Sequence, residues 1–402
     1  MSTALDVAGI APDPALPQLP LLLRPEGIAP ALARSLGREI SDARIAYVTY
    51  DPGQRVLVHY EVRENSEKHD AVVIAEAGTD LAARVNAPDS VMLVGAVDGR
   101  TPAHTPLAHD PDLDILIQWP PLDLALPALA ETAEGLRERI EQSGVAVGDS
   151  APQLVHYKPG RRVALRYGDH FLKLYASRGQ FQRAIHNLRA VEPLPIRTPA
   201  CEAVIEDLRI VVQSLVAGTE PGGSKPFAHD AGAVLARLHE ATLDGLRSAP
   251  APHWLRSASK SARVLSAVVP SLARRLATLV EDLERRMLDE DVVPCHCDFD
   301  VRQLLELDGD FALVDFDSMS TAPPALDLAS YIAGVADHAG LAEAAATLDA
   351  LVDGYGSRPA TVPWYLTIIL LRRARNPFRR FVDGWPDRIA ARVAVAETAL
   401  RW

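Results

Sequence analysis

The chain has 402 residues, of which 48% are hydrophobic and 23% charged, so it is too apolar for a disordered protein and long enough for two or three domains. Its net charge of −12 argues against nucleic acid or an anionic membrane surface as the main partner. Three cysteines, two of them one residue apart, cannot build a disulfide framework and fit a reducing compartment. The first 20 residues have no basic start and no long apolar core. We therefore expect no signal peptide and a cytoplasmic protein.

The first 170 residues contain an internal repeat. The sequence DPALP at 13–17 returns as DLALP at 123–127, and YDPGQRVLVHY at 50–60 returns as YKPGRRVALRY at 157–167. Each Pro-Gly pair lies between runs of β-branched and aromatic residues, which is typical of a β-hairpin. Two matches in the same order predict a duplicated unit of helix, hairpin and further strands.

The two copies differ in the strand that follows the hairpin. In the second copy this strand carries Lys173 among apolar residues, whereas the strand at 71–77 of the first copy has no lysine. A lysine at a solvent-exposed strand edge would be the ordinary interpretation. Its position directly after the second hairpin favours a binding role instead. A helix over 179–192 and two strands over 200–207 and 209–216 are predicted next.

Beyond residue 217 the chain is predicted to be mostly helical, with an acidic segment, CHCDFDVRQLLELDGDFALVDFD, at 295–317. A zinc site is a poor explanation for its start. Cys295, His296, Cys297 and Asp298 are consecutive and would point to opposite faces of an extended chain, whereas zinc ligands must converge. We expect both cysteines to be small buried residues.

The rest of the acidic segment reads as a hairpin that turns at Asp308-Gly309. A hairpin brings its two ends together, so Asp298 and Gln303 would lie near Asp315. Two carboxylates and an amide carbonyl are ligands that suit Mg²⁺.

The sequences HCDFDVRQLL, FALVDFD and APPALDLASYIAG together resemble the catalytic core of the aminoglycoside phosphotransferase and choline kinase superfamily, which is related to protein kinases. The resemblance covers about 150–340. It implies an α+β, protein-kinase-like bilobal fold, preceded by an extra N-terminal β-rich domain that duplicates the small lobe. The expected domains are an N-terminal cap at 1–120, the small lobe at 121–216, and a helical large lobe with the catalytic loop and acceptor site at 217–402.

The resemblance also implies roles for single residues. Asp298 matches the catalytic aspartate, which accepts the proton of the substrate hydroxyl. Gln303 and Asp315 match the ligands of Mg²⁺, while His296 and Asp327 match residues that support the loop. For the nucleotide, the implied binding residues are Lys173, Arg161 and Arg162 near the phosphates, and Gln213 and Leu215 in the hinge strand.

Three departures from the family pattern concern the same site. Gln303 stands where the family has asparagine, and Cys297 stands where it commonly has glycine. The glutamate expected to pair with Lys173 is missing from the middle of the 179–192 helix. That helix offers only Glu192 near its end, with Gln182 closer to the expected place.

The function implied is that of a small-molecule kinase. It would use Mg²⁺ and ATP or GTP to phosphorylate a hydroxyl of a sugar, aminoglycoside, amino alcohol or related metabolite. The alternative is a catalytically impaired, nucleotide-binding pseudokinase or scaffold protein. The N-terminal copy, which lacks the lysine, is expected to be a structural cap that packs on the small lobe and binds no nucleotide.

The acceptor stays open at this level. Asp337 and Asp353 would attract an amine if they faced the site, or would be solvated helix charges. The basic stretch RRARNPFRRFVDGWP at 372–386 would suit an anionic acceptor, or would be a helix end that packs Phe378, Phe381 and Trp385.

Overall fold

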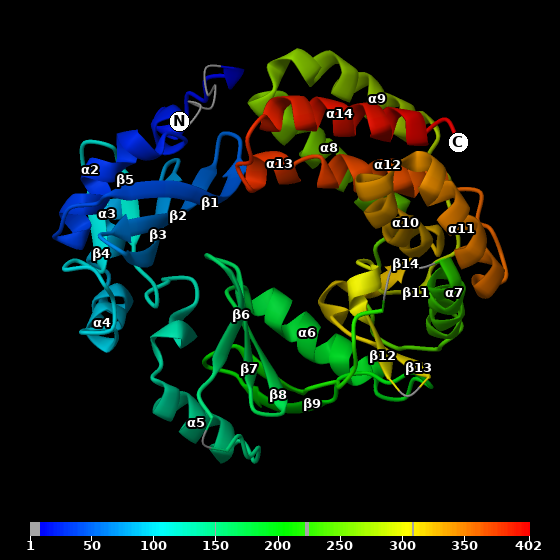
Figure 1. Cartoon of the computed structure of the whole chain (residues 1–402), viewed down its shortest axis with the longest axis horizontal. Helices are drawn as coiled ribbons and strands as arrows, with labels where there is room; N and C mark the ends of the chain where they lie inside the picture. Colours follow the sequence, from blue (N-terminus) through cyan, green and yellow to red (C-terminus); the bar gives the residue numbers. More distant parts are fainter. Residues whose placement is uncertain (1–8, 149, 222–224, 308) are drawn as a thin grey trace.

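The computed structural model describes residues 9–148, 150–221, 225–307 and 309–402. Asp308 of the predicted Asp-Gly turn lies outside these residues. Figure 1 shows two β-sheets and a helical region that follow one another along the chain and whose ribbons form a ring in this view.

The first sheet has five antiparallel strands in the order β1-β2-β3-β5-β4. They are β1 (Asp42–Asp51), β2 (Arg55–Glu64), β3 (Glu67–Glu76), β4 (Leu107–Asp110) and β5 (Ile115–Gln118). The helices α1 (Leu19–Leu22) and α2 (Pro25–Leu36) precede the sheet, and α3 (Leu81–Val85) and α4 (Pro88–Ala96) connect β3 to β4. Helix α2 buries Ile28, Leu32 and Leu36 on one face and ends at Gly37, whose positive φ of 77° suits a glycine.

The second sheet repeats this arrangement, with five strands in the order β6-β7-β8-β10-β9. They are β6 (Gln153–Lys158), β7 (Arg162–Tyr167), β8 (His170–Tyr175), β9 (Cys201–Ile205) and β10 (Ile210–Ser214). Helix α5 (Ala133–Gln142) comes before the sheet, and α6 (Arg178–Val191) follows β8 as predicted. The matching strand order confirms the β-rich duplication expected from the sequence.

A contact made by an aspartate repeats as well. In the first copy, the Asp13 carboxylate accepts hydrogen bonds from the Tyr50 hydroxyl and the Gly53 N–H, both at 2.7 Å. In the second copy, Asp123 accepts from Tyr157 at 3.0 Å and from the N–H of Gly160 at 2.7 Å. Both glycines have positive φ, which the Pro-Gly turn requires. The DPALP and DLALP sequences therefore anchor their own hairpins in the same way.

Among the described residues, the helical region contains eight α-helices and two pairs of short strands. The helices are α7 (Lys225–His239), α8 (Ala251–Val268), α9 (Ala273–Arg285), α10 (Ala325–Ala339), α11 (Leu341–Tyr355), α12 (Val362–Arg373), α13 (Asn376–Arg379) and α14 (Trp385–Ala399). The strand β11 (Val293–Cys295) pairs with β14 (Ser320–Ala322), and β12 (Leu304–Leu307) pairs with β13 (Asp310–Leu313). The loop that carries Asp298 therefore follows β11, and the loop that carries Asp315 follows β13.

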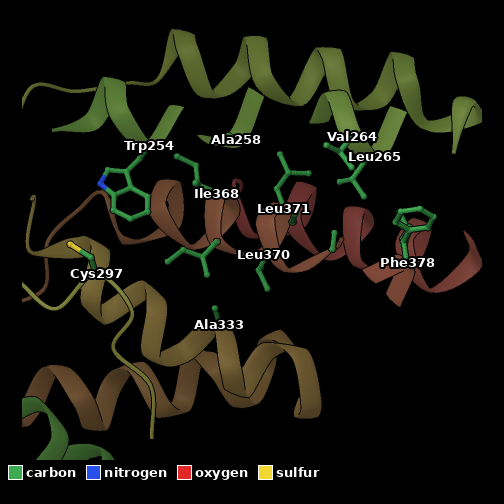
Figure 2. Close-up of a cluster of buried hydrophobic side chains, with 14 of the residues drawn as sticks. Trp254, Ala258, Val264, Leu265, Cys297, Ala333, Ile368, Leu370, Leu371 and Phe378 are labelled. Atoms are coloured by element: carbon green, nitrogen blue, oxygen red, sulfur yellow. The ribbon is translucent and has the colours of Figure 1, made fainter. Parts of the chain in front are cut away.

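Helix α12 lies in the centre of the large lobe, as expected for a buried apolar helix. Figure 2 shows Ile368 and Leu371 on the side of α12 that faces α8, and Leu370 on the side that faces Ala333 of α10. Trp254 of α8 lies at the end of this cluster near Cys297. The packed helices hold the C-terminal end of α12, with its arginines, beside the loop that carries Asp298. No helix in the described ranges is long and apolar enough to span a membrane.

The N-terminal domain packs on the small lobe, as expected for a cap, and it also contacts the large lobe, which the sequence did not predict. On the small lobe, the rings of His59 and Tyr157 lie 5.9 Å apart. On the large lobe, Tyr50 packs edge-on against Phe378 at 6.5 Å, and the Asp51 carboxylate lies 2.9 Å from the Lys260 ammonium. The buried apolar core of the domain is continuous with that of the large lobe. The domain therefore bridges the two lobes, and Figure 1 shows its strand β1 next to α13 of the large lobe.

Candidate active site

Lys173 of β8 faces the large lobe and contacts two carboxylates there. Its ammonium lies 2.6 Å from Asp315 and 2.8 Å from Asp317, and its side chain is only 9% exposed. Asp315 follows β13 and has a φ of 67°, a left-handed conformation that aspartate tolerates better than most residues. The structure thus brings together Lys173 and Asp315, which are 142 residues apart in sequence.

The charges of this cluster stabilise one another. Burial alone would raise the pKa of Asp315, but the nearby Lys173 and Arg162 outweigh it and hold that pKa well below its ordinary value. For Lys173, burial alone would lower the pKa, and Asp317 and Asp315 together raise it. Both groups are therefore charged at neutral pH, as a phosphate-binding lysine and a metal-binding carboxylate must be.

The sequence left Asp317 between a helper at the metal or substrate and a solvated turn residue, and the structure places it at the centre of the cluster. Its carboxylate accepts hydrogen bonds from Lys173, from the Tyr175 hydroxyl at 2.9 Å and from Arg162 at 2.9 Å. It supplies the second carboxylate for Lys173, in place of the glutamate that α6 lacks. The signal in the sequence is the second aspartate of VDFD, two residues after Asp315.

Helix α6 contacts the same loop through Asn187 instead of a glutamate. The buried Asn187 amide donates to the carbonyl oxygens of Phe316 at 2.8 Å and Met319 at 3.1 Å. Gln182 is exposed and bonds to Glu206, and Glu192 lies at the C-terminal end of the helix. Neither of these two residues forms the missing pair with Lys173 in the described part of the chain.

Asp327 holds the loop that precedes Asp298. Its two carboxylate oxygens accept from the backbone N–H groups of His296 at 2.7 Å and Cys297 at 2.8 Å. The fully buried His296 ring contacts the carbonyl oxygen of Val314 at 2.9 Å, which ties this loop to the residue before Asp315. Cys297 has a φ of 63°, which explains why a glycine suits this position in the family.

The cysteines of this segment are buried, as expected. Cys295 and Cys297 are 0% and 6% exposed, and burial raises the pKa of both thiols. Atoms of His239, Cys295 and Asp327 lie within 4.8 Å of one another. The Asp327 oxygens are already occupied by backbone N–H groups, however, so this trio braces the loop and is no open metal site.

Asp298 points into the cleft and is exposed to its solvent. The protein that surrounds the cleft nevertheless desolvates this carboxylate, and the desolvation raises its pKa. The charge of Asp315 also raises the pKa of Asp298, while His296 and Arg372 oppose the shift. Within the described residues, no hydrogen bond ties down its carboxylate. Asp300, which had no predicted role, is buried and fixes the same loop through ion pairs with Arg302 at 3.0 Å and Arg373 at 3.1 Å.

Two compartments open from this cluster. The first has a volume of about 540 Å³ and is lined by Lys173, Asp315, Gln303, Gln213 and Leu215, among others. A second, of about 440 Å³, contains Asp298. Asp315 and Arg162 line both, so the compartments meet at these two residues. Of the residues predicted to bind the nucleotide, Arg161 alone lies in the second compartment and not in the first.

The sequence model of the phosphotransferase enzyme family matches residues 160–365, about half of the chain. The chain belongs to this family. The predicted superfamily and the predicted enzyme class, a phosphotransferase that acts on an alcohol group, are therefore confirmed, and the two-lobed α+β structure agrees with the predicted fold class. No curated protein matches the chain.

Several solved structures are similar to this phosphotransferase at low sequence identity. A choline/ethanolamine kinase family protein from Mesorhizobium loti has 17% identity and a TM-score of 0.48, with 66% of this chain and 94% of that chain covered. A choline kinase from Streptococcus pneumoniae has 14% identity and a TM-score of 0.48, covering 66% and 97%. A macrolide 2′-phosphotransferase from Brachybacterium faecium has 17% identity and a TM-score of 0.46, covering 65% and 98%. The family assignment rests on the sequence match and not on these scores.

Proposed function

We propose that this phosphotransferase is a small-molecule kinase that transfers the γ-phosphate of ATP or GTP to a hydroxyl group. The observation that carries the proposal is the meeting of two compartments at Arg162 and at Asp315, which is paired with Lys173. One compartment contains Asp298 and the other contains residues of the hinge strand β10. One compartment would hold the nucleotide and the other the acceptor. Phosphoryl transfer needs the acceptor hydroxyl and the γ-phosphate held in line beside a charged clamp, and it needs little covalent help.

The residues present fit a magnesium–nucleotide complex. Asp315 is ionised, and Gln303 offers an amide oxygen in the same compartment. The carbonyl oxygen of Gln303 accepts from the N–H of Val314 at 2.9 Å, so its backbone is fixed beside Asp315. Carboxylate and amide oxygens are ligands that Mg²⁺ prefers, and Mg²⁺ supplies charge neutralisation on the phosphates when bound.

Each remaining residue has a defined task in this proposal. Lys173 and Arg162 would bind phosphate oxygens, and Gln213 and Leu215 would line the base pocket. Asp298 would orient the acceptor hydroxyl and take its proton. His296 and Asp327 would support the loop through the backbone contacts described above. Asp317 would keep Lys173 in place.

The alternative, a catalytically impaired pseudokinase or scaffold, has less support. A protein that only binds nucleotide has no need for an untied carboxylate at the entrance of a second compartment, and Asp298 is such a carboxylate. The domain boundaries at 120 and 216 and the cytoplasmic location stay predictions in either case.

The test is turnover of Mg-ATP and Mg-GTP by the purified protein with mixtures of hydroxylated acceptors, followed by release of the nucleoside diphosphate and by mass spectrometry of the product. We expect acceptor-dependent turnover with at least one of the two nucleotides, and its loss in Asp315→Asn. Nucleotide binding without transfer to any acceptor would favour the scaffold alternative.

A further inference from the structure

The second compartment, which contains Asp298, is strongly basic. Seven lysine and arginine side chains line it, against three carboxylates. Two of these carboxylates, Asp315 and Asp317, already pair with Lys173 and Arg162. Within the described residues, no ion pair joins Lys158, Arg372 or Arg379 to a carboxylate. The compartment therefore carries positive charge that the protein does not neutralise.

Four of the seven cations belong to the small lobe, and the other three lie on the large-lobe side of the cleft, next to Asp298. Of these three, Arg372 lies in the last turn of α12, Arg379 ends α13, and Arg247 lies in the loop before α8. The hinge strand and Gln303 line the other compartment and are absent from this one. The cations of the large lobe thus surround the place of the acceptor and not that of the nucleotide base.

Aromatic rings hold two of these arginines in place. The Arg372 guanidinium lies 5.1 Å from the centre of the Trp254 ring, and the Trp254 indole N–H is bound to the Ala249 carbonyl at 2.9 Å. The Arg379 guanidinium lies 5.1 Å from the ring centre of Tyr47, which belongs to the N-terminal domain. Stacking uses the face of a guanidinium and leaves its N–H edge available for a carboxylate or phosphate. Both groups are therefore preorganised donors.

The pKa values of three of these cations are lowered, as expected where positive groups lie close together without a negatively charged partner. Burial, and then the neighbouring Arg162, Arg161 and Arg379, lowers the pKa of Lys158 to about 8. Burial also lowers the pKa of Arg372 and Arg379, and the charge of Arg161 adds to the effect on Arg379. An anion placed among these groups would relieve their mutual repulsion.

A cationic acceptor finds no such support. Asp337, which the sequence left as a candidate for attracting an amine, is paired with Arg373 at 3.4 Å and Arg392 at 3.4 Å, and its side chain is only 8% exposed. Asp353 is a solvated helix residue with an 82% exposed side chain and does not line the compartment. Because Asp315 and Asp317 are already paired with cations, Asp298 is the one lining carboxylate left to bind the amine of an aminoglycoside or amino alcohol, and many cations surround it.

We propose that the acceptor is a hydroxyl compound that already carries a phosphate or carboxylate group, bound by Arg372, Arg247 and Arg379 while its hydroxyl faces Asp298. This inference rests on the proposed function. In the reaction, the acceptor oxygen forms a bond to the γ-phosphorus and its proton passes to Asp298. The bond from the γ-phosphorus to the bridging oxygen breaks, and the nucleoside diphosphate leaves with the electron pair. The product therefore carries two anionic groups.

The experiment compares matched acceptors with the full-length protein and Mg-nucleotide. The pairs are glycerol 3-phosphate with glycerol, glucose 6-phosphate with glucose, and glycerate with glycerol, and choline and kanamycin serve as cationic acceptors. The kcat/KM of each is obtained from release of nucleoside diphosphate. We expect the anionic member of at least one pair to exceed its neutral partner by roughly 10- to 100-fold, the range for one or more charge-assisted hydrogen bonds. The phosphate and carboxylate pairs show which anion is preferred.

Two variants connect the preference to these residues. Arg372→Gln should raise the KM of the anionic acceptor by roughly 10- to 100-fold and leave nucleotide affinity close to the parent. Since Arg372 is largely buried, Arg247→Gln, which changes an exposed loop residue, gives an independent check in a protein that folds normally. Arg263→Gln on the exposed face of α8, outside the compartment, is the matched control and should change nothing.

The outcomes separate this inference from the proposed function. Nucleotide binding, measured by calorimetry without acceptor, reports on the proposed function alone. If the protein binds nucleotide and no anionic acceptor exceeds its neutral partner, or a cationic acceptor is preferred, the inference is overturned and the kinase assignment stands. An anionic preference that both arginine variants leave unchanged also overturns the assignment of these residues.

Discussion

Ile74 in β3 occupies the position of the first sheet that Lys173 occupies in the second. Ile74 pairs with Leu57 and Leu116, and Lys173 pairs with the corresponding residues, Ala164 and Val211. In the first sheet this face is covered, because α3 and α4 pack on an apolar cluster that includes Ile74 and Leu57. In the second sheet the same face is open and lines the proposed nucleotide compartment. The two sheets therefore have the same strand order, but at this position the first sheet has a buried isoleucine and the second has Lys173, which lines a cleft.

The first prediction concerns the number of nucleotide sites in each chain. Calorimetry with Mg-nucleotide should give about one site per chain, and the combined change Lys173→Ala with Asp315→Ala should abolish binding. Ile74→Val is the matched control on the first sheet. It should cost about 0.5–1.5 kcal/mol of stability, as for other buried isoleucines, and leave the stoichiometry unchanged. A stoichiometry of two would contradict the assignment of the first copy as a structural cap.

A second prediction concerns Asp298→Asn. Transfer should fall by roughly 10²–10⁴-fold, the range for a positioned acid–base group, while nucleotide affinity stays close to the parent. The active form is the carboxylate, and burial and the charge of Asp315 raise its pKa. Activity of the parent should therefore be lost as the pH falls through a value above the ordinary aspartate range. The pH dependence of kcat checks this, and parent-like transfer by the variant would show that Asp298 has another role.

The same change should stabilise the protein at neutral pH. A carboxylate whose pKa is higher in the folded state than in the unfolded chain makes folding less favourable once it is ionised. Removing that charge in Asp298→Asn should raise the melting temperature at pH 7, and the gain should shrink as the pH falls toward the raised pKa. Thermal unfolding at several pH values measures it. A lower melting temperature at pH 7 would mean that the carboxylate has stabilising contacts in solution.

How far the sequence predicts this structure depends on the range of the signals. The hairpins, strand β8 and helix α6 follow from local alternation and helical spacing, and the acidic motifs placed Asp298, Gln303 and Asp315 around one cleft. The bridging of both lobes by the N-terminal domain could not be read, because contacts such as Tyr50 with Phe378 join surfaces with no shared sequence pattern. Helix α8 lies in the region that was predicted to be mostly helical, but its contribution of Trp254 to the site was not predicted.

The partner of Lys173 shows why motif matching has a limit. A family pattern assigns the partner to a glutamate on α6, and no local rule transfers that task to another element. Here Asp317 pairs with the lysine, and Asn187 on α6 holds the loop that carries Asp317. The ion pair is kept, but it runs from β8 to the large lobe and not from β8 to a side chain of α6.

A third prediction tests this arrangement. Asn187→Ala removes the two hydrogen bonds from this buried amide to the carbonyl oxygens of Phe316 and Met319, and Phe316 keeps the bond from the Met319 N–H at 3.1 Å. We expect a loss of about 2–4 kcal/mol in the free energy of unfolding and weaker Mg-dependent nucleotide binding, because Asp315 begins the same loop. Gln182→Ala, on the exposed side of the same helix, should change stability by less than about 0.5 kcal/mol. Equal effects of the two changes would contradict the role given to Asn187.

The fourth prediction uses the two repeated aspartates as controls for each other. Asp13→Ala and Asp123→Ala each remove the acceptor for a tyrosine hydroxyl and a glycine N–H, so each should cost about 1–3 kcal/mol of stability. Only the second hairpin carries Lys158, Arg161 and Arg162 into the site, so only Asp123→Ala should also lower kcat/KM, by about 10-fold or more.

Burial would raise the pKa of Asp13, but its hydrogen bonds outweigh this and lower it. The stability that Asp13 contributes is therefore present at neutral pH and lost as the pH falls through that lowered pKa, and the Asp13→Ala difference should vanish in acid. Unfolding curves and steady-state kinetics on both variants decide the matter: equal loss of activity would mean that the first hairpin also shapes the site.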